Sequence, residues 1–256
     1  YNVRNRGPAV PTEKPMPSVI WMRPVRGRRG PEPSRDRDAI ARAAIAVADR
    51  EGLAAVSMRR IAAEIGTSAS SLYRYVARKD DLLNLMVDAA LGAGELQPSG
   101  DWRMDLQQIG HAMRAVFKAH PWLTTALAGR PTLGPNRLRA LEAMLTLLAP
   151  SGLPLAEQLA LIDVLTSYVR GFVASELASD AAIRQSGLSA AQWHADQAAY
   201  TAAIRASGVY PLTSALFDEL QRTGAADQDA GFAAGLDIVL EGIAARWAVV
   251  RHGKPT

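Results

Sequence analysis

Residues 57–83, SMRRIAAEIGTSASSLYRYVARKDDLL, constrain the fold more strongly than any other stretch of the chain. Apolar residues recur at helical spacing from Met58 to Ile65, so a short helix with one apolar face is predicted there. Ser57 stands at the N-cap position, where its hydroxyl can accept from the first free backbone N–H groups. Gly66 follows the last apolar residue, as expected of a left-handed residue that ends a helix.

A second helix is expected directly after this turn, capped by Thr67 or Ser68. Leu72 and Val76 lie four positions apart and face inward, and the rest of the helix is polar or aromatic. Two short helices joined by a glycine turn form a helix-turn-helix unit, whose second helix can enter the major groove of DNA. The pattern therefore predicts a DNA-binding protein.

This stretch, together with the helix before it, resembles the DNA-binding domain of the TetR family, the tetracycline-repressor-like transcription regulators of bacteria. Val76 stands where many members carry Phe, and Tyr75 stands where a subset with a Leu-Tyr-x-His-Val run has His. These differences concern the preferred DNA sequence and not the fold. The resemblance covers about fifty residues and rests on these segments: Ala43–Gly52, Met58–Ala62, Gly66–Ser68, Leu72–Val76 and Lys79–Leu83.

The resemblance implies an all-α, cytoplasmic homodimer with an N-terminal three-helix helix-turn-helix DNA-binding domain and a C-terminal helical domain for ligand binding and dimerisation. We expect a basic, disordered arm at 1–33, the DNA-binding domain with its connecting helix at 34–95, and the C-terminal domain at 96–256. The implied function is a sequence-specific transcription repressor that a small-molecule ligand releases from a palindromic operator. The expected partners are double-stranded operator DNA, a second copy of the chain and an unknown small-molecule effector.

Composition supports an all-α fold and narrows the function. Ala and Leu dominate, and runs of Val, Ile and Thr that alternate at period 2 are absent. The absence of cysteine excludes disulfides, thiolate catalysis and cysteine-based metal sites, and it fits a reducing compartment. No apolar run reaches membrane-spanning length, so no membrane association is expected. Glycine-rich phosphate loops, nucleophile elbows and HExxH motifs are also missing, which argues against an enzyme and against a cofactor or a metal.

Positive charge is concentrated at the N-terminus. Residues 1–37 hold nine Lys or Arg against three Asp or Glu, whereas the rest of the chain is close to neutral. The stretch around Arg26, Arg28 and Arg29 combines arginine with glycine, and such side chains can enter a narrow minor groove. The alternative is a solvated basic tail without a defined contact. Trp21, with Val19 and Ile20 before it, is unusual for a disordered arm and could pack locally or against a partner chain.

The residues predicted to contact DNA combine hydroxyl groups, cations and aromatic rings. Serine and threonine hydroxyls can donate to phosphates or base edges, and the ring of Tyr73 can cover a thymine methyl group. Arg74 could hold a guanine through two hydrogen bonds or be merely solvated, and Tyr75 could contact the DNA backbone or support packing. The resemblance places Lys79 at a phosphate and implies phosphate contacts near the start of the first helix, where Arg35 and Arg37 could serve or could equally be plain surface charges. The full set is Arg26, Arg28, Arg29, Arg59, Thr67, Ser68, Ser70, Ser71, Tyr73, Arg74, Tyr75 and Lys79.

The C-terminal part of the chain is a series of amphipathic stretches. Helices are predicted at these ranges: 102–119, 122–128, 137–149, 155–178, 189–206, 211–220 and 232–250, with a polar link at 179–186. The helices at 155–178 and 229–251 are apolar on more faces than a monomer of this size requires. They predict a four-helix dimer interface, in line with the family resemblance, although both could also be monomer core.

Aromatic and polar residues from several of these helices predict a small-molecule pocket. A cavity lined by aromatic rings with a few polar groups is the usual small-ligand site, although aromatic stripes can also be plain core. The candidate ligand-binding residues are His111, Met113, Phe117, Trp122, Tyr168, Phe172, Trp193 and Tyr200. The helix from Lys79 to about Glu95 faces both domains, so it is expected to transmit a ligand-induced shift to the recognition helices. A non-specific DNA binder and a protein-binding helical module remain the alternative functions.

Overall fold

The computed structural model describes residues 19–23, 36–92, 98–127, 133–223 and 227–252. Every regular element in these ranges is a helix, so the all-α prediction is confirmed. The N-terminal head contains η1 (Ile20–Met22), α1 (Arg37–Glu51), η2 (Leu53–Ala55), α2 (Met58–Glu64), α3 (Ala69–Tyr73) and α4 (Lys79–Leu91). The C-terminal body contains α5 (Trp102–Ala119), α6 (Leu123–Ala126), α7 (Pro135–Leu148), η3 (Ala149–Ser151), α8 (Leu155–Ser186), α9 (Ala190–Ser207), α10 (Pro211–Thr223) and α11 (Gln228–His252).

Both predicted caps of the helix-turn-helix unit are present. The Ser57 hydroxyl accepts from the backbone N–H of Arg60 at 3.2 Å, and the Ser68 hydroxyl accepts from that of Ser71 at 3.3 Å. Gly66 takes a φ of +65°, which allows the N–H of Thr67 to reach the carbonyl of Ala62 at 2.8 Å. The turn therefore satisfies the backbone groups freed at the end of α2, and it sets the angle between α2 and α3.

The core of the head lies where α1 crosses α4. Apolar side chains from all four helices meet there, and each loses nearly all of its contact with solvent. Full burial of a Leu or Ile side chain stabilises a fold by about 1.5–3 kcal/mol, so this shared core holds the short helices α2 and α3, which would not persist alone. The central residues are Ile40, Ala44, Val47, Ile61, Leu72, Val76, Leu82 and Met86.

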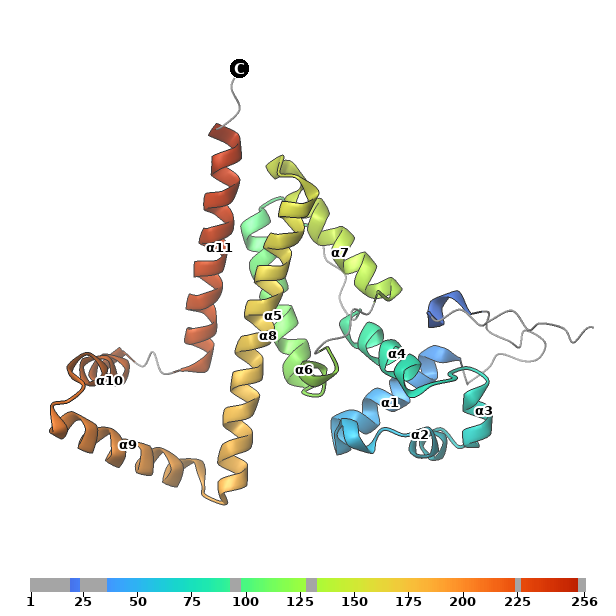
Figure 1. Cartoon of the computed structure of the whole chain (residues 1–256), viewed down its shortest axis with the longest axis horizontal. Coiled ribbons are helices and arrows are strands. Elements are labelled where there is room, and N and C mark those ends of the chain that lie inside the picture. The colour runs from blue at the N-terminus through green and yellow to red at the C-terminus, as the bar shows by residue number, and fades with distance from the viewer. Residues whose placement is uncertain (1–18, 24–35, 93–97, 128–132, 224–226, 253–256) are drawn as a thin grey trace, which may run out of the picture.

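The prediction of a structureless arm at 1–33 is wrong for residues 19–23. Ile20 is 1% exposed and belongs to the core of the head, and Trp21 packs against that core. Arg23 is buried and forms an ion pair with the buried Asp81 of α4. An apolar side chain and a paired charge thus fix this short segment to the head, as Figure 1 shows for η1 beside α4.

The body is built on α5, α8 and α11, with α7 packed on α8. The prediction of a polar link at 179–186 is wrong, since α8 continues to Ser186. This stretch contains neither Pro nor Gly and consists largely of residues that tolerate a helix. The helix ends only at Gly187, which takes a φ of +71°.

Helices α9 and α10 stand away from the rest of the body and pack mainly against each other (Figure 1). Their apolar side chains are largely uncovered; Leu212 of α10 is 85% exposed and Tyr200 of α9 is 66% exposed. Among the described residues, no single helix is long and apolar enough to cross a membrane. Only the bent pair of residues 135–151 and α8, with an angle of 120°, reaches the length and composition of a span.

Candidate DNA-binding surface and effector site

The polar face of α3 is open to solvent. Tyr73 is 54% exposed, and Ser70 and Arg74 are exposed beside it. The Ser68 hydroxyl lies 3.0 Å from that of Ser70 and 2.9 Å from that of Ser71, so the start of the helix presents a cluster of hydroxyl groups. Thr67, in the turn before α3, is half-buried, and Lys79 begins α4 with an exposed side chain. The structure thus gathers hydroxyl groups, an aromatic ring and cations around one short helix, as expected for a surface that reads DNA.

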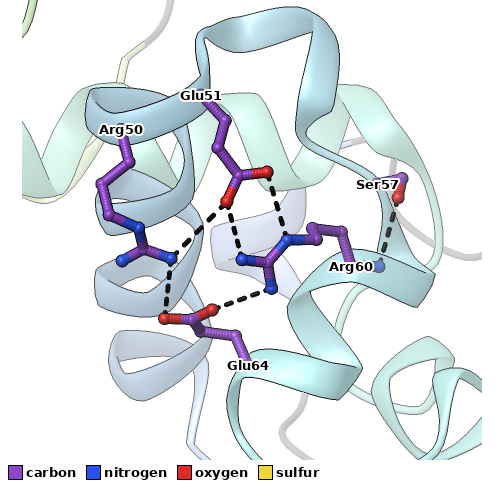
Figure 2. Close-up of polar contacts among 5 residues, drawn as sticks. All are labelled: Arg50, Glu51, Ser57, Arg60 and Glu64. Carbon is purple, nitrogen blue, oxygen red and sulfur yellow. Dashed lines mark hydrogen bonds and ion pairs between the residues drawn. The ribbon is translucent and has the colours of Figure 1, made fainter.

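The two arginines at the start of α2 differ in their surroundings. Arg60 binds Glu51 of α1 at 2.6 Å and Glu64 at 2.8 Å, and Arg50 binds Glu64 at 2.9 Å (Figure 2). The hydrogen bonds from Arg60 hold the pKa of Glu51 below its usual value, and those from Arg50 and Arg60 do the same for Glu64. The two carboxylates raise the pKa of Arg60. This network joins the end of α1 to α2.

Arg59, by contrast, is exposed and forms no hydrogen bond or ion pair with any residue that the structure describes. Its guanidinium is therefore available to a phosphate without the loss of an internal contact. Contact of Arg59 with DNA stays a prediction.

Tyr75 and Arg37 both contribute to the interior of the head. The half-buried Tyr75 ring packs against the apolar core, in agreement with the supporting role that was one of its two predicted functions. Arg37 points inward and donates to three backbone carbonyls, among them that of Tyr75 at 3.3 Å. The surface role considered for Arg37 is therefore wrong. Arg26, Arg28, Arg29 and Arg35 lie outside the described residues, so DNA contact by these arginines stays a prediction.

An aromatic cluster lies where α5, α8 and α11 meet. Tyr168 stacks on Phe232 with the ring centres 5.6 Å apart, and Phe172 meets the same ring edge-on at 5.3 Å. His111 approaches Phe232 from α5, also at 5.3 Å. The Tyr168 hydroxyl donates to the Phe232 carbonyl at 2.7 Å, and burial raises the pKa of this tyrosine. Gly235 permits the close approach, because a Cβ there would overlap the Tyr168 ring.

A charged group borders this cluster. The buried Arg114 forms a two-pronged ion pair with the buried Glu176, and it also contacts Asp229 at 2.7 Å. Its guanidinium lies over the Phe232 ring, 4.7 Å from the centre, where a cation is attracted to the π-face. A hollow of about 190 Å³ opens beside Phe172 and Glu176. Sequence reasoning did not select Arg114, Glu176 or Phe232 as site residues. The available signal was that Arg114 on α5 and Glu176 on α8 each interrupt an apolar stripe.

The other predicted ligand-binding residues are not gathered in this cluster. Phe117 is buried and Met113 half-buried, and both belong to the packing of the core. Trp122 turns toward the head, where its indole N–H donates to Asp49. Trp193 and Tyr200 lie on α9, away from the cluster. The expectation that all eight residues meet around one cavity is therefore wrong for this single chain, because α9 leaves the body at the end of α8.

Two carboxylates of the head connect it to the body. Asp49 of α1 accepts from the Trp122 indole at 2.7 Å and lies 2.8 Å from the Nδ1 atom of His120. Asp88 of α4 accepts from the backbone N–H groups of Asn136 at 3.2 Å and Arg137 at 3.0 Å, in the first turn of α7. Each interaction is directional, so the orientation of the head depends on the positions of α5, α6 and α7.

The body also exposes an apolar groove between α8 and α11. It has a volume of about 560 Å³, and an ion pair between Glu157 and Arg246 borders it. Val164 and Ile238 point outward there, and Ile238 is 70% exposed. These are the two helices for which a dimer interface is predicted. Within the described residues, no group of three or more His, Asp or Glu side chains is arranged to hold a metal ion.

Comparison with known proteins gives matches along most of the chain. Residues 40–86 match the family described as bacterial regulatory proteins, tetR family, and residues 93–247 match the tetracyclin repressor-like C-terminal domain. The repressor DrrR1 of Streptomyces coeruleorubidus is 37% identical over 228 residues, which cover 88% of this chain and 83% of DrrR1.

Solved structures of ActR from Streptomyces coelicolor are similar over the same extent. The complex of ActR with actinorhodin is 29% identical, with a TM-score of 0.69, and covers 84% of this chain and 99% of ActR. The apo form of ActR gives a TM-score of 0.68 over 85% of this chain and 98% of ActR.

Proposed function

The chain belongs to the TetR family of DNA-binding transcription regulators, and from this premise we propose that it is a homodimeric repressor of the cytoplasm that binds a palindromic operator and is released by a small-molecule effector. The observation that carries this proposal is the exposed polar face of α3, which lies on the core of the head after serine caps at the starts of α2 and α3. A two-fold dimer presents two such faces, which match two half-sites separated by a whole number of helical turns of DNA.

Different residues serve different parts of the DNA contact. Tyr73 at the end of α3 and Arg74 directly after it face the base edges, where an apolar ring can meet a thymine methyl group and a guanidinium can bind guanine. Arg59 and Lys79, at the starts of α2 and α4, bind phosphates on either side of the groove. Phosphate contacts fix the position of the head, and base contacts select the operator.

The second copy of the chain covers the groove between α8 and α11. Side chains such as Val164 and Ile238 lose their contact with water when the same helices of the partner pack against them. Their burial stabilises the dimer by about 25 cal/mol for each Å² of apolar surface removed from water. The comparison with DrrR1, which matches along nearly the same length, supports a repressor rather than an activator.

The effector site lies at the aromatic cluster of α5, α8 and α11. Its rings favour a planar aromatic molecule. An acidic group of that molecule replaces the carboxylate of Asp229 as a partner of Arg114, because the Asp229 side chain is 77% exposed and can turn into solvent. The ActR structure with actinorhodin supports binding of a small molecule by a protein of this architecture. The ligand must bind the DNA-free state more tightly than the DNA-bound state, because otherwise it shifts nothing.

Helix α5 connects this cluster to the head. It carries His111 and Arg114 at the cluster, and it ends at His120, which contacts Asp49 of α1. A displacement of α5 by a bound ligand therefore strains the contact between His120 and Asp49. The contact between Asp88 and the start of α7 limits the movement of α4 that can accompany this displacement. The two recognition helices then lose the spacing that the operator requires.

Selection from a random DNA pool tests the DNA-binding part of this proposal. We expect a palindromic sequence to be enriched and its affinity to fall about tenfold with Tyr73→Ala or Arg59→Ala. Tyr200→Ala is the matched control for the tyrosine variant, since that side chain is also exposed but lies on α9. Affinity that depends on salt and not on sequence would overturn specific regulation and favour the non-specific binder.

Ligand release is tested separately with the selected operator. Aromatic acids and their neutral analogues are screened for displacement of the intact protein from the labelled operator. Arg114→Gln is expected to reduce the response to the acids by at least tenfold while operator affinity is kept. An equal response to acidic and neutral compounds by both proteins would contradict the role given to Arg114.

A further inference from the structure

A short segment far from α3 in the sequence is built into the DNA-binding head. Residues Val19–Arg23, which we name the strap, contain the 3-10 turn η1 and close it with a hydrogen bond from the Arg23 N–H to the Ile20 carbonyl at 3.1 Å. Ile20 is 1% exposed, whereas Met22 in the same turn is 71% exposed. Ile20, with Trp21 packed against the same core, therefore anchors the strap to the head, while Met22 faces solvent.

The strap is also fixed by a buried ion pair at the beginning of α4. Arg23 donates to the Asp81 carboxylate at 2.5 Å, and both side chains are almost completely removed from solvent. Arg78, the residue just before α4, approaches the same carboxylate at 3.7 Å. Removing one partner of a buried pair leaves an uncompensated charge, so this contact strongly favours one position of the strap on α4.

Arg37 joins the strap to the end of the recognition helix. Its guanidinium donates to the Ile20 carbonyl at 3.0 Å, the Arg23 carbonyl at 3.1 Å and the Tyr75 carbonyl at 3.3 Å. Tyr75 lies two residues after the end of α3, and α4 begins four residues later. One guanidinium from α1 thus holds both the strap and the connection between α3 and α4. Burial and the neighbouring Arg23 lower the pKa of Arg37.

We propose that the strap is a positioning element for operator recognition: through Arg37 and the Arg23–Asp81 pair, it fixes the angle at which α3 meets DNA. Arg23 and Ile20 then determine sequence specificity without contacting DNA, because they fix the position of α3. This inference rests on the proposed function, because it concerns how well the recognition helix fits its operator. It assigns the segment a task separate from the basic stretch that follows it.

Two N-terminal deletions isolate the strap. Deletion of residues 1–18 keeps the strap, and deletion of residues 1–23 removes it while leaving Arg26, Arg28 and Arg29 on the chain. Affinity is measured for the selected operator and for a scrambled duplex of equal length. We expect the longer deletion to bind the operator about tenfold more weakly than the shorter one, the loss typical of one misaligned base contact. Affinity for the scrambled duplex, which depends on phosphates, is expected to be the same for both.

Point variants within the strap give the same test without a deletion. Ile20→Asn is expected to behave like the longer deletion, and Met22→Asn, its exposed neighbour, like the intact chain. Arg23→Gln removes the charge of the ion pair and is expected to lower the ratio of operator to scrambled-duplex affinity in the same way. Arg23→Lys keeps a cation near Asp81 and is expected to restore part of that ratio.

The outcomes separate positioning from folding. Equal losses for the operator and the scrambled duplex, accompanied by a lower melting temperature, would mean that the strap only keeps the head folded and would overturn the proposal. Unchanged operator affinity in Arg23→Gln and Ile20→Asn would overturn it as well. Failure of the intact chain to select any operator would instead refute the proposed function. A specificity ratio that falls while scrambled-duplex affinity stays constant supports the strap as a positioning element.

Discussion

Replacement of Asp88 by alanine is expected to weaken the junction between α4 and α7. The Asp88 side chain is 5% exposed, and its two oxygens accept the backbone N–H groups of Asn136 and Arg137. The residue before α7 is Gly134, which has no side chain to cap the helix. Asp88 therefore supplies from α4 the cap that α7 lacks.

The size of the effect follows from these two hydrogen bonds. Loss of an N-cap costs about 1 kcal/mol, and each hydrogen bond to a charged group contributes about 1.5–3 kcal/mol. Because water can reach the freed N–H groups once the carboxylate is gone, we expect a loss of about 2 kcal/mol for Asp88→Ala. In a chain of this length, that loss lowers the melting temperature by about 4–8 °C. Asp88→Asn keeps one acceptor and is expected to lose about half as much.

Gly134 provides a partner variant for this experiment. A Cβ at Gly134 would overlap the Asp88 carboxylate, whereas its backbone φ of −90° is accessible to any residue. Gly134→Ala is thus expected to destabilise the protein for a steric reason alone. The same substitution in the Asp88→Ala protein should cost less, because the carboxylate atoms that overlap most are absent and only the Cβ of residue 88, at 2.7 Å, still overlaps.

Urea and thermal unfolding of the four proteins of this cycle measure the coupling between the two sites. Asp196→Ala serves as the control, since Asp196 is exposed on α9 and contacts no described side chain. If Gly134→Ala had the same cost with and without the Asp88 carboxylate, the junction would not be organised as described. A loss for Asp88→Ala no larger than that for Asp196→Ala would refute the capping role.

Three further predictions concern other parts of the molecule. Trp122→Phe keeps an aromatic ring but removes the donor to Asp49, and urea unfolding of this variant and of Asp49→Ala, singly and combined, should give a coupling of about 1 kcal/mol between the two sites. The folded state lowers the pKa of Glu51 and Glu64 from the usual value of 4.5, so their ion pairs stabilise the fold above that pH and lose this effect as the pH falls below it. The melting temperatures of the intact chain and of Arg60→Gln should therefore converge as the pH falls below 4.5, and a constant gap would contradict the network. Sedimentation should show that Ile238→Glu, in the groove, yields monomers, whereas the control Leu212→Glu, at a site that is even more exposed, stays dimeric.

Local signals were sufficient to predict the helix-turn-helix unit of the head. Ser57, Gly66 and Ser68 act through hydrogen bonds and backbone angles within a few residues of themselves, so sequence spacing alone located the caps of α2 and α3. The C-terminal helices were located for the same reason, because their apolar stripes repeat at helical spacing. The end of α8 was missed, since a polar stretch without Gly or Pro is compatible with either a link or a helix that has little to cover it.

Contacts between distant segments could not be predicted in this way. The pairing of Arg114 with Glu176 joins residues 62 positions apart, and that of Arg23 with Asp81 joins residues 58 positions apart. In the linear sequence these four charged residues look like surface residues, and only the packing of the segments shows that they are buried. Trp21 and Ile20 did give a signal, as apolar residues in a basic segment, but that signal did not identify the surface that they would cover.

Two carboxylate contacts join the head to the body, in addition to the packing of α4 on α5, α6 and α7, and they limit the motions that an effector can cause. Asp49 fixes the end of α1 to the turn between α5 and α6, and Asp88 fixes α4 to the start of α7. If only one of these carboxylate contacts breaks, the head rotates about the other. Because His120 ends the helix that carries Arg114, a ligand at the aromatic cluster acts first on Asp49. The expected movement is therefore a rotation of the head about the Asp88 junction, and this movement changes the separation of the two recognition helices while α4 stays attached to α7.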